Sequence, residues 1–385
     1  MLLNEERAVK PIRHLYVHIP FCPHICPYCS FHVLPVHKEH AEKLVDHLLA
    51  EYNSIARNLN LHTIFLGGGT PTALSIARLE RLLSAMLQRV PRLVESRSGI
   101  QRPASRIEIT SECNPSTLSS QKAERLLSLG VNRLSIGAQS FDPAVLKTLG
   151  RTHSAAAIVQ CVETARRAGF ININLDLIFG VPGQTLVSWK STLETALSLQ
   201  PRHISCYGLT YEEDTDFFVR RQRGELKSND PLESAMFDLA DQMLTRAGFG
   251  HYEISNYALP EFECRHNLAY WQGEDYYGIG PSAVSTVNGV RWRNSKFKDG
   301  CWKAEEEERL SPETLASERM ALGLRIAEGI KEVSFAAKFG FLPRERWRNE
   351  IDTLIQNQLL IASPALQLTR RGREVADEVA ICFMQ

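Results

Sequence analysis

The stretch Leu15-Tyr-Val-His-Ile-Pro-Phe-Cys22-Pro-His-Ile-Cys26-Pro-Tyr-Cys29 places three cysteines in one short loop, directly after an apolar run. Thiolates this close together repel one another and lose hydration, so they gather mainly where a metal supplies compensating positive charge. The apolar run predicts a β-strand over residues 15–19. The stretch therefore predicts a metal site immediately after a strand.

Two kinds of metal site are compatible with three cysteines in this loop. A structural zinc site is closed and four-coordinate, and it usually takes its ligands as two separated pairs, whereas this loop holds one triplet without a second pair. An iron–sulfur cluster offers four irons, of which a triplet fills three, so one iron stays open for a ligand from outside the protein. The alternative is a Cys3His zinc site, with its fourth ligand drawn from the nearby histidines His18, His24 and His32.

The composition is ordinary for a soluble globular protein. The 385 residues are 44% hydrophobic and 23% charged, which allows one large domain and a smaller one. Lys+Arg and Asp+Glu both total 44, so no overall field recruits nucleic acid, and any membrane contact should be peripheral. The first residues lack the apolar core of a signal peptide, and no stretch approaches the roughly 18 apolar residues of a membrane span. The other six cysteines are scattered and resemble reduced core residues, which favours a cytoplasmic location.

Strand-like and helix-like segments alternate through the first half of the chain. The strands are expected at residues 15–19, 63–66, 106–112, 132–137, 170–179 and 203–209, each followed by a helical pattern. Six such units imply a parallel sheet with right-handed crossovers. Because a full barrel needs eight strands, we predict an α/β fold with an open, partial (β/α)6 TIM-like barrel.

The regular alternation of strand-like and helix-like segments ends after residue 210. We expect a polar loop at 211–230, a helix at 231–247, a strand at 250–257, a polar and aromatic segment at 261–300, and a helix at 312–328. The acidic run Glu305–Glu308 is interpreted as a solvated loop or helix face. The predicted division is a lead-in (1–14), the barrel (15–210), an extension (211–300) and a smaller C-terminal α+β, winged-helix-like module (301–385).

Polar residues lie at the carboxyl ends of several predicted strands. In barrels of this type the functional residues are found at these strand ends. Three glycines in Gly67–Thr70 follow the second strand and let backbone groups approach a ligand. Glu112 ends the third strand, Gln139 the fourth, Asp176 lies late on the fifth, and Arg151 follows the fourth unit's helical turn. The set suits a ligand with an ammonium group, a carboxylate and ribose hydroxyls, since Arg151 offers a planar fork and the acids accept hydrogen bonds.

The cysteine spacing after a strand resembles that of the radical S-adenosylmethionine (SAM) superfamily, whose open iron chelates SAM and whose cluster cleaves it to a 5′-deoxyadenosyl radical. The resemblance narrows to the oxygen-independent coproporphyrinogen III oxidase family, over most of residues 13–290. It is carried by Tyr16-Val-His-Ile-Pro-Phe-Cys22, Gly67-Gly-Gly-Thr-Pro71, Glu112-Cys-Asn-Pro115, Ile136-Gly-Ala-Gln139-Ser-Phe, Asp176-Leu-Ile-Phe-Gly-Val-Pro182 and Tyr207-Gly-Leu-Thr.

The resemblance implies cofactors and site residues. A [4Fe-4S] cluster would be held by Cys22, Cys26 and Cys29, with SAM beside it. The SAM contacts would be Tyr16, Tyr28, Gly68, Gly69, Thr70, Glu112, Gln139, Arg151, Asp176, Gly208 and Val284. Many family members have histidine where this chain has Val284.

Two branches of the family share this core. The oxidases carry a further cysteine two residues after the triplet, where this chain has Phe31, and an N-terminal extension before a strand that here begins by residue 15. The other branch, the heme chaperones of the HemW type, is marked by the motif His266-Asn-Leu-Ala-Tyr270-Trp271. The resemblance implies heme bound near His266, with Tyr270 and Trp271 as stacking rings.

The hypothesis is therefore a protein that holds heme and delivers it to client hemoproteins, with an electron donor such as a flavodoxin or ferredoxin. The alternative is an enzyme, the oxidase that decarboxylates coproporphyrinogen III; no catalytic residue is identified for it. A third hypothesis, a nucleic-acid-modifying radical SAM enzyme, is disfavoured by the balanced charge. The clusters Arg220–Arg223 and Arg344–Arg348 are interpreted as solvated faces.

Overall fold

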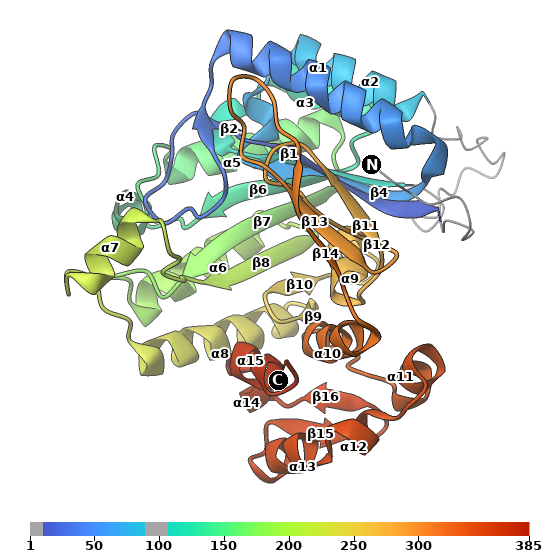
Figure 1. Cartoon of the computed structure of the whole chain (residues 1–385). Coiled ribbons are helices and arrows are strands. Elements are labelled where there is room, and N and C mark those ends of the chain that lie inside the picture. The colour runs from blue at the N-terminus through green and yellow to red at the C-terminus, as the bar shows by residue number, and fades with distance from the viewer. Residues whose placement is uncertain (1–10, 89–106, 385) are drawn as a thin grey trace, which may run out of the picture. The chain divides into compact units, whose positions relative to one another are not determined.

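The computed structural model describes residues 11–88 and 107–384, and most of the predicted lead-in lies outside these ranges. The described chain packs as two compact units, each assembled from segments that are distant in sequence (Figure 1). Unit 1 contains 11–88, 107–137, 156–173 and 275–309. Unit 2 contains 138–155, 174–274 and 310–384.

Unit 1 is built on a mixed sheet with the strand order β14-β13-β12-β11-β1-β4-β5-β6. The pairs from β11 to β6 are parallel, and those from β11 to β14 are antiparallel. The strands are β1 (Ile12–Ile19), β4 (Leu59–Gly68), β5 (Glu108–Cys113), β6 (Arg133–Gln139), β11 (Tyr276–Ile279), β12 (Val284–Val287), β13 (Val290–Asn294) and β14 (Ala304–Arg309). A short parallel pair, β2 (Phe21–Cys22) and β3 (Leu34–Pro35), flanks the cysteine loop. The first four predicted strands are thereby confirmed.

Helices follow the parallel strands of unit 1, as their apolar spacing predicts. They are α1 (Lys38–Ile55), α2 (Ile76–Leu87), α3 (Ser120–Ser128) and α5 (Ala155–Ala168). Leu44, Leu48 and Tyr52 lie one turn apart on α1 and are buried, because side chains at this spacing share one face of a helix. The Tyr52 hydroxyl donates to the carbonyl of Met86 at 2.8 Å, which joins α1 to α2, and Figure 1 shows these helices side by side.

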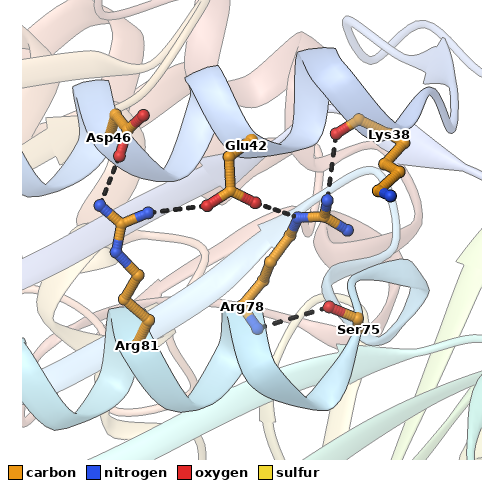
Figure 2. A network of polar contacts seen from close by, with 6 residues as sticks. All are labelled: Lys38, Glu42, Asp46, Ser75, Arg78 and Arg81. Atoms are coloured by element: carbon orange, nitrogen blue, oxygen red, sulfur yellow. Dashed lines mark hydrogen bonds and ion pairs between the residues drawn. The ribbon is translucent and has the colours of Figure 1, made fainter.

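An exposed ionic network also joins α1 to α2 (Figure 2). The Glu42 carboxylate accepts from Arg78 Nε at 3.0 Å and from Arg81 Nη1 at 2.9 Å, and Arg81 also pairs with Asp46. The Glu42 side chain is 50% exposed, so water and salt screen these pairs and each contributes less than about 1 kcal/mol.

Glu51, further along α1, has a different environment. Its carboxylate accepts from the Gly280 N–H at 2.9 Å, from Asn294 Nδ2 at 2.9 Å and from Trp302 Nε1 at 2.8 Å. Burial raises the pKa of this carboxyl, against the effect of the three hydrogen bonds. The contacts fasten α1 to the ends of β11 and β13 and to the loop that follows.

Glu51→Ala is expected to lower the free energy of unfolding by about 3 kcal/mol, because three donors lose their acceptor at about 1 kcal/mol each. Glu42→Ala, on the same helix, is expected to lower it by less than about 1 kcal/mol. Urea unfolding of both variants measures the difference. Equal losses would contradict this assignment.

In the barrel part of unit 2, β7 and β8 are parallel, and β10 and β9 extend the order β7-β8-β10-β9 antiparallel. The strands are β7 (Asn172–Phe179), β8 (His203–Gly208), β9 (Gly250–Glu253) and β10 (Asn256–Ala258). The helices are α4 (Pro143–Thr148), α6 (Leu186–Ser198), α7 (Asp216–Gln222), α8 (Asp230–Arg246) and α9 (Arg265–Trp271). The fifth and sixth predicted strands are confirmed as β7 and β8.

The C-terminal part of unit 2 has its own core. Phe335, Trp347, Ile351 and Leu366 are buried together in it. Helices followed by a two-stranded antiparallel wing match the predicted winged-helix-like pattern. The elements are α10 (Pro312–Gly323), α11 (Glu332–Phe339), α12 (Pro343–Arg346), α13 (Arg348–Gln356), β15 (Leu360–Ala362), β16 (Leu366–Leu368), α14 (Arg370–Glu374) and α15 (Ala376–Ile381). None of the helices in the described ranges combines the length and apolar character that crossing a bilayer requires.

Several expectations for the second half of the chain were wrong in detail. The strand predicted at 250–257 is the hairpin β9–β10, because a turn at Ile254 and Ser255 divides it. The loop predicted at 211–230 contains α7, and the segment 261–300 contains α9 and three strands. The run Glu305–Glu308 is solvated but lies in β14, where the register places Glu308 opposite Arg291 on β13.

Candidate functional site

The cysteine loop begins where β1 ends. Cys26 is buried, and Cys22 and Cys29 are half-buried. The Cys29 N–H donates to the Cys26 carbonyl at 3.1 Å and closes a turn, while Cys22 Sγ lies 3.3 Å from Thr70 Oγ1. In residues 11–88 and 107–384, no three His, Cys, Asp or Glu side chains meet closely enough to hold one metal ion. The three thiols nevertheless share one loop of unit 1, with the chemistry that an iron–sulfur cluster requires.

The glycine loop after β4 lies directly against this segment. The Gly69 N–H donates to the Ile19 carbonyl at 2.9 Å, and the Thr70 N–H donates to the Phe21 carbonyl at 2.8 Å. A Cβ at Gly69 would lie 2.8 Å from the carbonyl carbon of Pro20, closer than real Cβ atoms approach. Only glycine fits here, so the loop presents bare backbone beside the cysteines.

The ring of His18 packs against the same glycine loop at Gly68. Its Nε2–H donates to the His32 carbonyl at 2.9 Å, so Nδ1 is the acceptor for the Tyr16 hydroxyl at 3.1 Å. Burial lowers the pKa of His18 to about 4, so the ring is neutral near pH 7. The His32 Nε2 in turn accepts from the Phe297 N–H at 3.1 Å. Two of the three histidines considered as a fourth zinc ligand are thus engaged in structural hydrogen bonds.

Acid is expected to destabilise the apo-protein through His18. Unfolded histidine has the ordinary pKa of 6.5, so the unfolded state binds the proton first, and stability is lost as the pH falls from 6.5 towards 4. At pH 5 the loss relative to pH 7 is about 2 kcal/mol. His18→Gln keeps a donor and an acceptor without titrating. Urea unfolding of both proteins at the two pH values should show a smaller loss in the variant, and an identical loss would contradict the argument.

Unit 1 gathers most of the predicted SAM contacts. Burial and, secondarily, the charge of Glu112 raise the pKa of Tyr16 well above its usual value, so Tyr16 remains a neutral donor. Glu112 lies against the glycine loop, since a Cβ at Gly67 would be 2.9 Å from its Oε1. The carbonyl of Val284 packs against Gly278, the residue paired with Tyr16 in the β1–β11 register. Tyr28 is half-buried within the cysteine loop.

Unit 2 contains the other predicted SAM contacts. Gln139 ends β6 with φ +66, a strained conformation for a side chain of this size that often marks functional strand ends. Arg151 and His153 line a cavity of about 410 Å³ beside α4. Asp176 on β7 accepts a hydrogen bond from Asn174 Nδ2 at 2.8 Å. Gly208 is exposed at the end of β8.

The predicted heme motif forms α9. His266 and Tyr270 are four residues apart and therefore share one face of the helix. Tyr270 is 41% exposed. Trp271 is held differently, because the Arg325 guanidinium lies 4.8 Å from its ring centroid and Arg319 Nη1 donates to its carbonyl at 3.2 Å. Tyr270 is thus partly exposed and contacts the Trp271 ring edge-on at 5.0 Å between centroids, whereas Arg325 lies over the Trp271 ring.

The buried polar groups around these residues were not predicted from the sequence. Asn174, His203 and Tyr252 are hydrogen-bonded to one another in unit 2 and were not predicted as part of a site. The alternation Asn172-Ile-Asn174-Leu-Asp176 was a usable signal, since polar residues at every second position mark one face of a strand. The arginines that hold Trp271 gave no comparable signal.

Comparison with known proteins places these features in a family. The pattern of the radical SAM superfamily matches residues 16–196, and that of the HemN C-terminal domain matches residues 310–375. The structure is similar to that of coproporphyrinogen III oxidase (HemN) from Escherichia coli, with a TM-score of 0.80 and 22% identity over 99% of this chain and 92% of that one. This likeness confirms the predicted fold, a radical SAM TIM-like barrel with a smaller C-terminal domain.

Curated relatives match almost end to end. Proteins named heme chaperone HemW are 36% identical in Lactococcus lactis subsp. lactis (96% of this chain, 96% of the relative) and 35% identical in Bacillus subtilis (97% and 99%). The HemW protein of Escherichia coli is 34% identical (97% and 98%). With its cysteine triplet, its glycine loop and the α9 motif, the chain belongs to the HemW family of radical SAM heme chaperones.

Proposed function

We propose that this protein is a heme chaperone, which binds heme at α9 and delivers it to client hemoproteins. The observation that carries the proposal is the match over 96% of the chain to relatives named heme chaperones. Phe31 supports it further, since it stands where the oxidase branch has another cysteine. The 22% identity to the oxidase HemN concerns the fold alone.

In this proposal α9 supplies the heme contacts. The imidazole of His266 would ligate the iron, and the exposed ring of Tyr270 would stack on the porphyrin from the same helix face. Trp271 would act mainly as a support, because arginines of the C-terminal part hold its ring and carbonyl. The proposed domain division assigns this helix to the extension over residues 211–300.

The radical SAM match implies a [4Fe-4S] cluster and SAM. Cys22, Cys26 and Cys29 would hold the cluster, which when bound supplies an electron and an open iron site. Gly68 and Gly69 let the loop pack closely on His18 and on the backbone that follows β1, and this loop backbone would lie beside SAM. The remaining proposed contacts are Tyr16, Tyr28, Thr70, Glu112, Gln139, Arg151, Asp176, Gly208 and Val284.

Charge complementarity supports the proposed SAM contacts. The Arg151 guanidinium would bind the SAM carboxylate through two parallel hydrogen bonds. Glu112 and Asp176 would accept from the amine or the ribose hydroxyls. The electron would come from a donor such as a flavodoxin or a ferredoxin, which fits a protein that works in the cytoplasm.

A heme titration tests the proposed function. Wild-type protein is expected to bind heme with a shifted Soret band, and His266→Ala is expected to bind it at least about tenfold more weakly, equivalent to about 1.4 kcal/mol. His47→Ala replaces an exposed histidine on α1 and should leave heme affinity unchanged. Equal affinity in wild type and His266→Ala would remove His266 from the site, and absence of heme binding to wild type would overturn the proposal.

A further inference from the structure

A continuous chain of hydrogen bonds crosses unit 2 from β7 to the start of α9. The Cys264 N–H donates to the Tyr252 hydroxyl oxygen at 3.2 Å, and that hydroxyl lies 2.8 Å from His203 Nε2. His203 Nδ1 lies 2.6 Å from Asn174 Oδ1, and Asn174 Nδ2 donates to Asp176 Oδ1 at 2.8 Å. Cys264 is the residue that precedes α9, so the chain connects Asp176 to the beginning of the heme-motif helix.

The direction of every hydrogen bond in this chain is fixed by chemistry. A carboxylate only accepts, so Asn174 presents its NH2 group to Asp176 and its carbonyl oxygen to His203. His203 must then carry its proton on Nδ1, which leaves Nε2 to accept from the Tyr252 hydroxyl. The Tyr252 oxygen in turn accepts from the Cys264 backbone N–H.

Burial makes this chain a unit that changes as a whole. Asn174 is 1% exposed, His203 and Cys264 are 0% exposed, and Tyr252 is 9% exposed. Water therefore does not replace a broken link, and each unsatisfied group costs about 1–3 kcal/mol. Because each link has a fixed direction, a change in charge at Asp176 alters the strength of every hydrogen bond that follows it.

The chain also crosses the elements that hold α9 in place. Asp176 and Asn174 lie on β7, His203 on β8 and Tyr252 on β9. The other end of α9 is held by Arg319 through the Trp271 carbonyl. The position of α9 therefore depends at its beginning on the Tyr252 hydroxyl and at its end on the C-terminal part.

We propose that this chain of hydrogen bonds couples SAM binding at Asp176 to heme binding at α9, with Asn174, His203 and Tyr252 as positioning residues. The inference rests on the proposed function, which assigns Asp176 to SAM and α9 to heme. A SAM hydroxyl or ammonium group that donates to Asp176 withdraws negative charge from the Asn174 contact. The change is passed through His203 and Tyr252 to the Cys264 N–H, and so alters where α9 begins.

Coupling of this kind is reciprocal and measurable. Heme affinity is determined anaerobically on cluster-reconstituted protein, with and without saturating SAM. In the wild type SAM is expected to change the heme dissociation constant by roughly fivefold or more. In Tyr252→Phe, which removes the hydroxyl, and in Asn174→Ala, which breaks the chain at its other end, the factor is expected to fall below about twofold.

Tyr257→Phe is the matched control, because Tyr257 is a buried tyrosine of β10 whose hydroxyl has no hydrogen-bond partner within the described residues. It should keep the wild-type factor, as a purely structural loss would affect affinity without removing the response to SAM. The coupling would be overturned if SAM left the heme dissociation constant of the wild type unchanged, or if SAM changed it in Tyr252→Phe or Asn174→Ala as much as in the wild type. Either result would leave the proposed function standing. Absence of heme binding to the wild type would overturn the proposed function as well.

Discussion

Cys26→Ala is expected to abolish assembly of the [4Fe-4S] cluster. In the proposed site each of three thiolates ligates one iron, and the fourth iron is left for SAM, so losing one thiolate leaves two irons without a protein ligand. Cys26 is buried within the loop, and the other two cysteines are only half-buried. Iron and sulfide content, together with the visible absorption of anaerobically reconstituted protein, measure the effect.

Cys301→Ala is the matched control for this experiment. Cys301 is an exposed free cysteine outside the loop, and its loss should leave iron and sulfide content at the wild-type level. A normal cluster in Cys26→Ala would show that another side chain supplies the ligand, and the assignment of the triplet would be wrong.

Gly68→Ala is expected to lower the free energy of unfolding by about 3 kcal/mol or more and to abolish SAM binding. Gly68 has φ +100, and a Cβ there would lie 2.5 Å from the ring of His18. His18 cannot move easily, because both ring nitrogens are hydrogen-bonded within the site. Denaturant unfolding and SAM binding to reconstituted protein provide the two measurements.

Gly183→Ala separates backbone strain from this contact. Gly183 has φ +84, but a Cβ there would meet nothing within 4 Å, so only the strain of about 1 kcal/mol remains. SAM binding should then persist. If the two alanine variants lost equal stability, the packing of the glycine loop on His18 would not be the cause.

The barrel strands of this fold were predictable because their signals are local. Each apolar run ends in a residue type that breaks the strand, and a helical pattern follows within a few residues. Strands β11 to β14 were missed because their positions depend on long-range pairing, as in the parallel pairing of Tyr277 with Leu15. The strand at Glu305–Glu308 depends on arginines across the sheet, a partnership that an acidic run does not reveal by itself.

The chemistry of the candidate site was predictable to a similar degree. Cysteine spacing and the glycine loop identify the kind of cofactor, since both depend on neighbouring residues. Whether a histidine is available as a metal ligand depends on partners that are distant in sequence. His18 Nε2 donates to the His32 carbonyl, and His32 Nε2 accepts from the Phe297 N–H. In the hydrogen-bond chain from Asp176 to Cys264, only the β7 residues left a signal in the sequence. The part played by Tyr252 was not predictable, because it comes from a strand that the sequence did not separate from its neighbour.

The cysteine loop and α9 are proposed to serve heme delivery rather than porphyrinogen oxidation. One anaerobically reconstituted preparation, with SAM and a reductant present, should be assayed in parallel for heme binding and for decarboxylation of coproporphyrinogen III. We expect stoichiometric heme binding that depends on His266, and no formation of protoporphyrinogen. Turnover of coproporphyrinogen III by a preparation that binds no heme would contradict it.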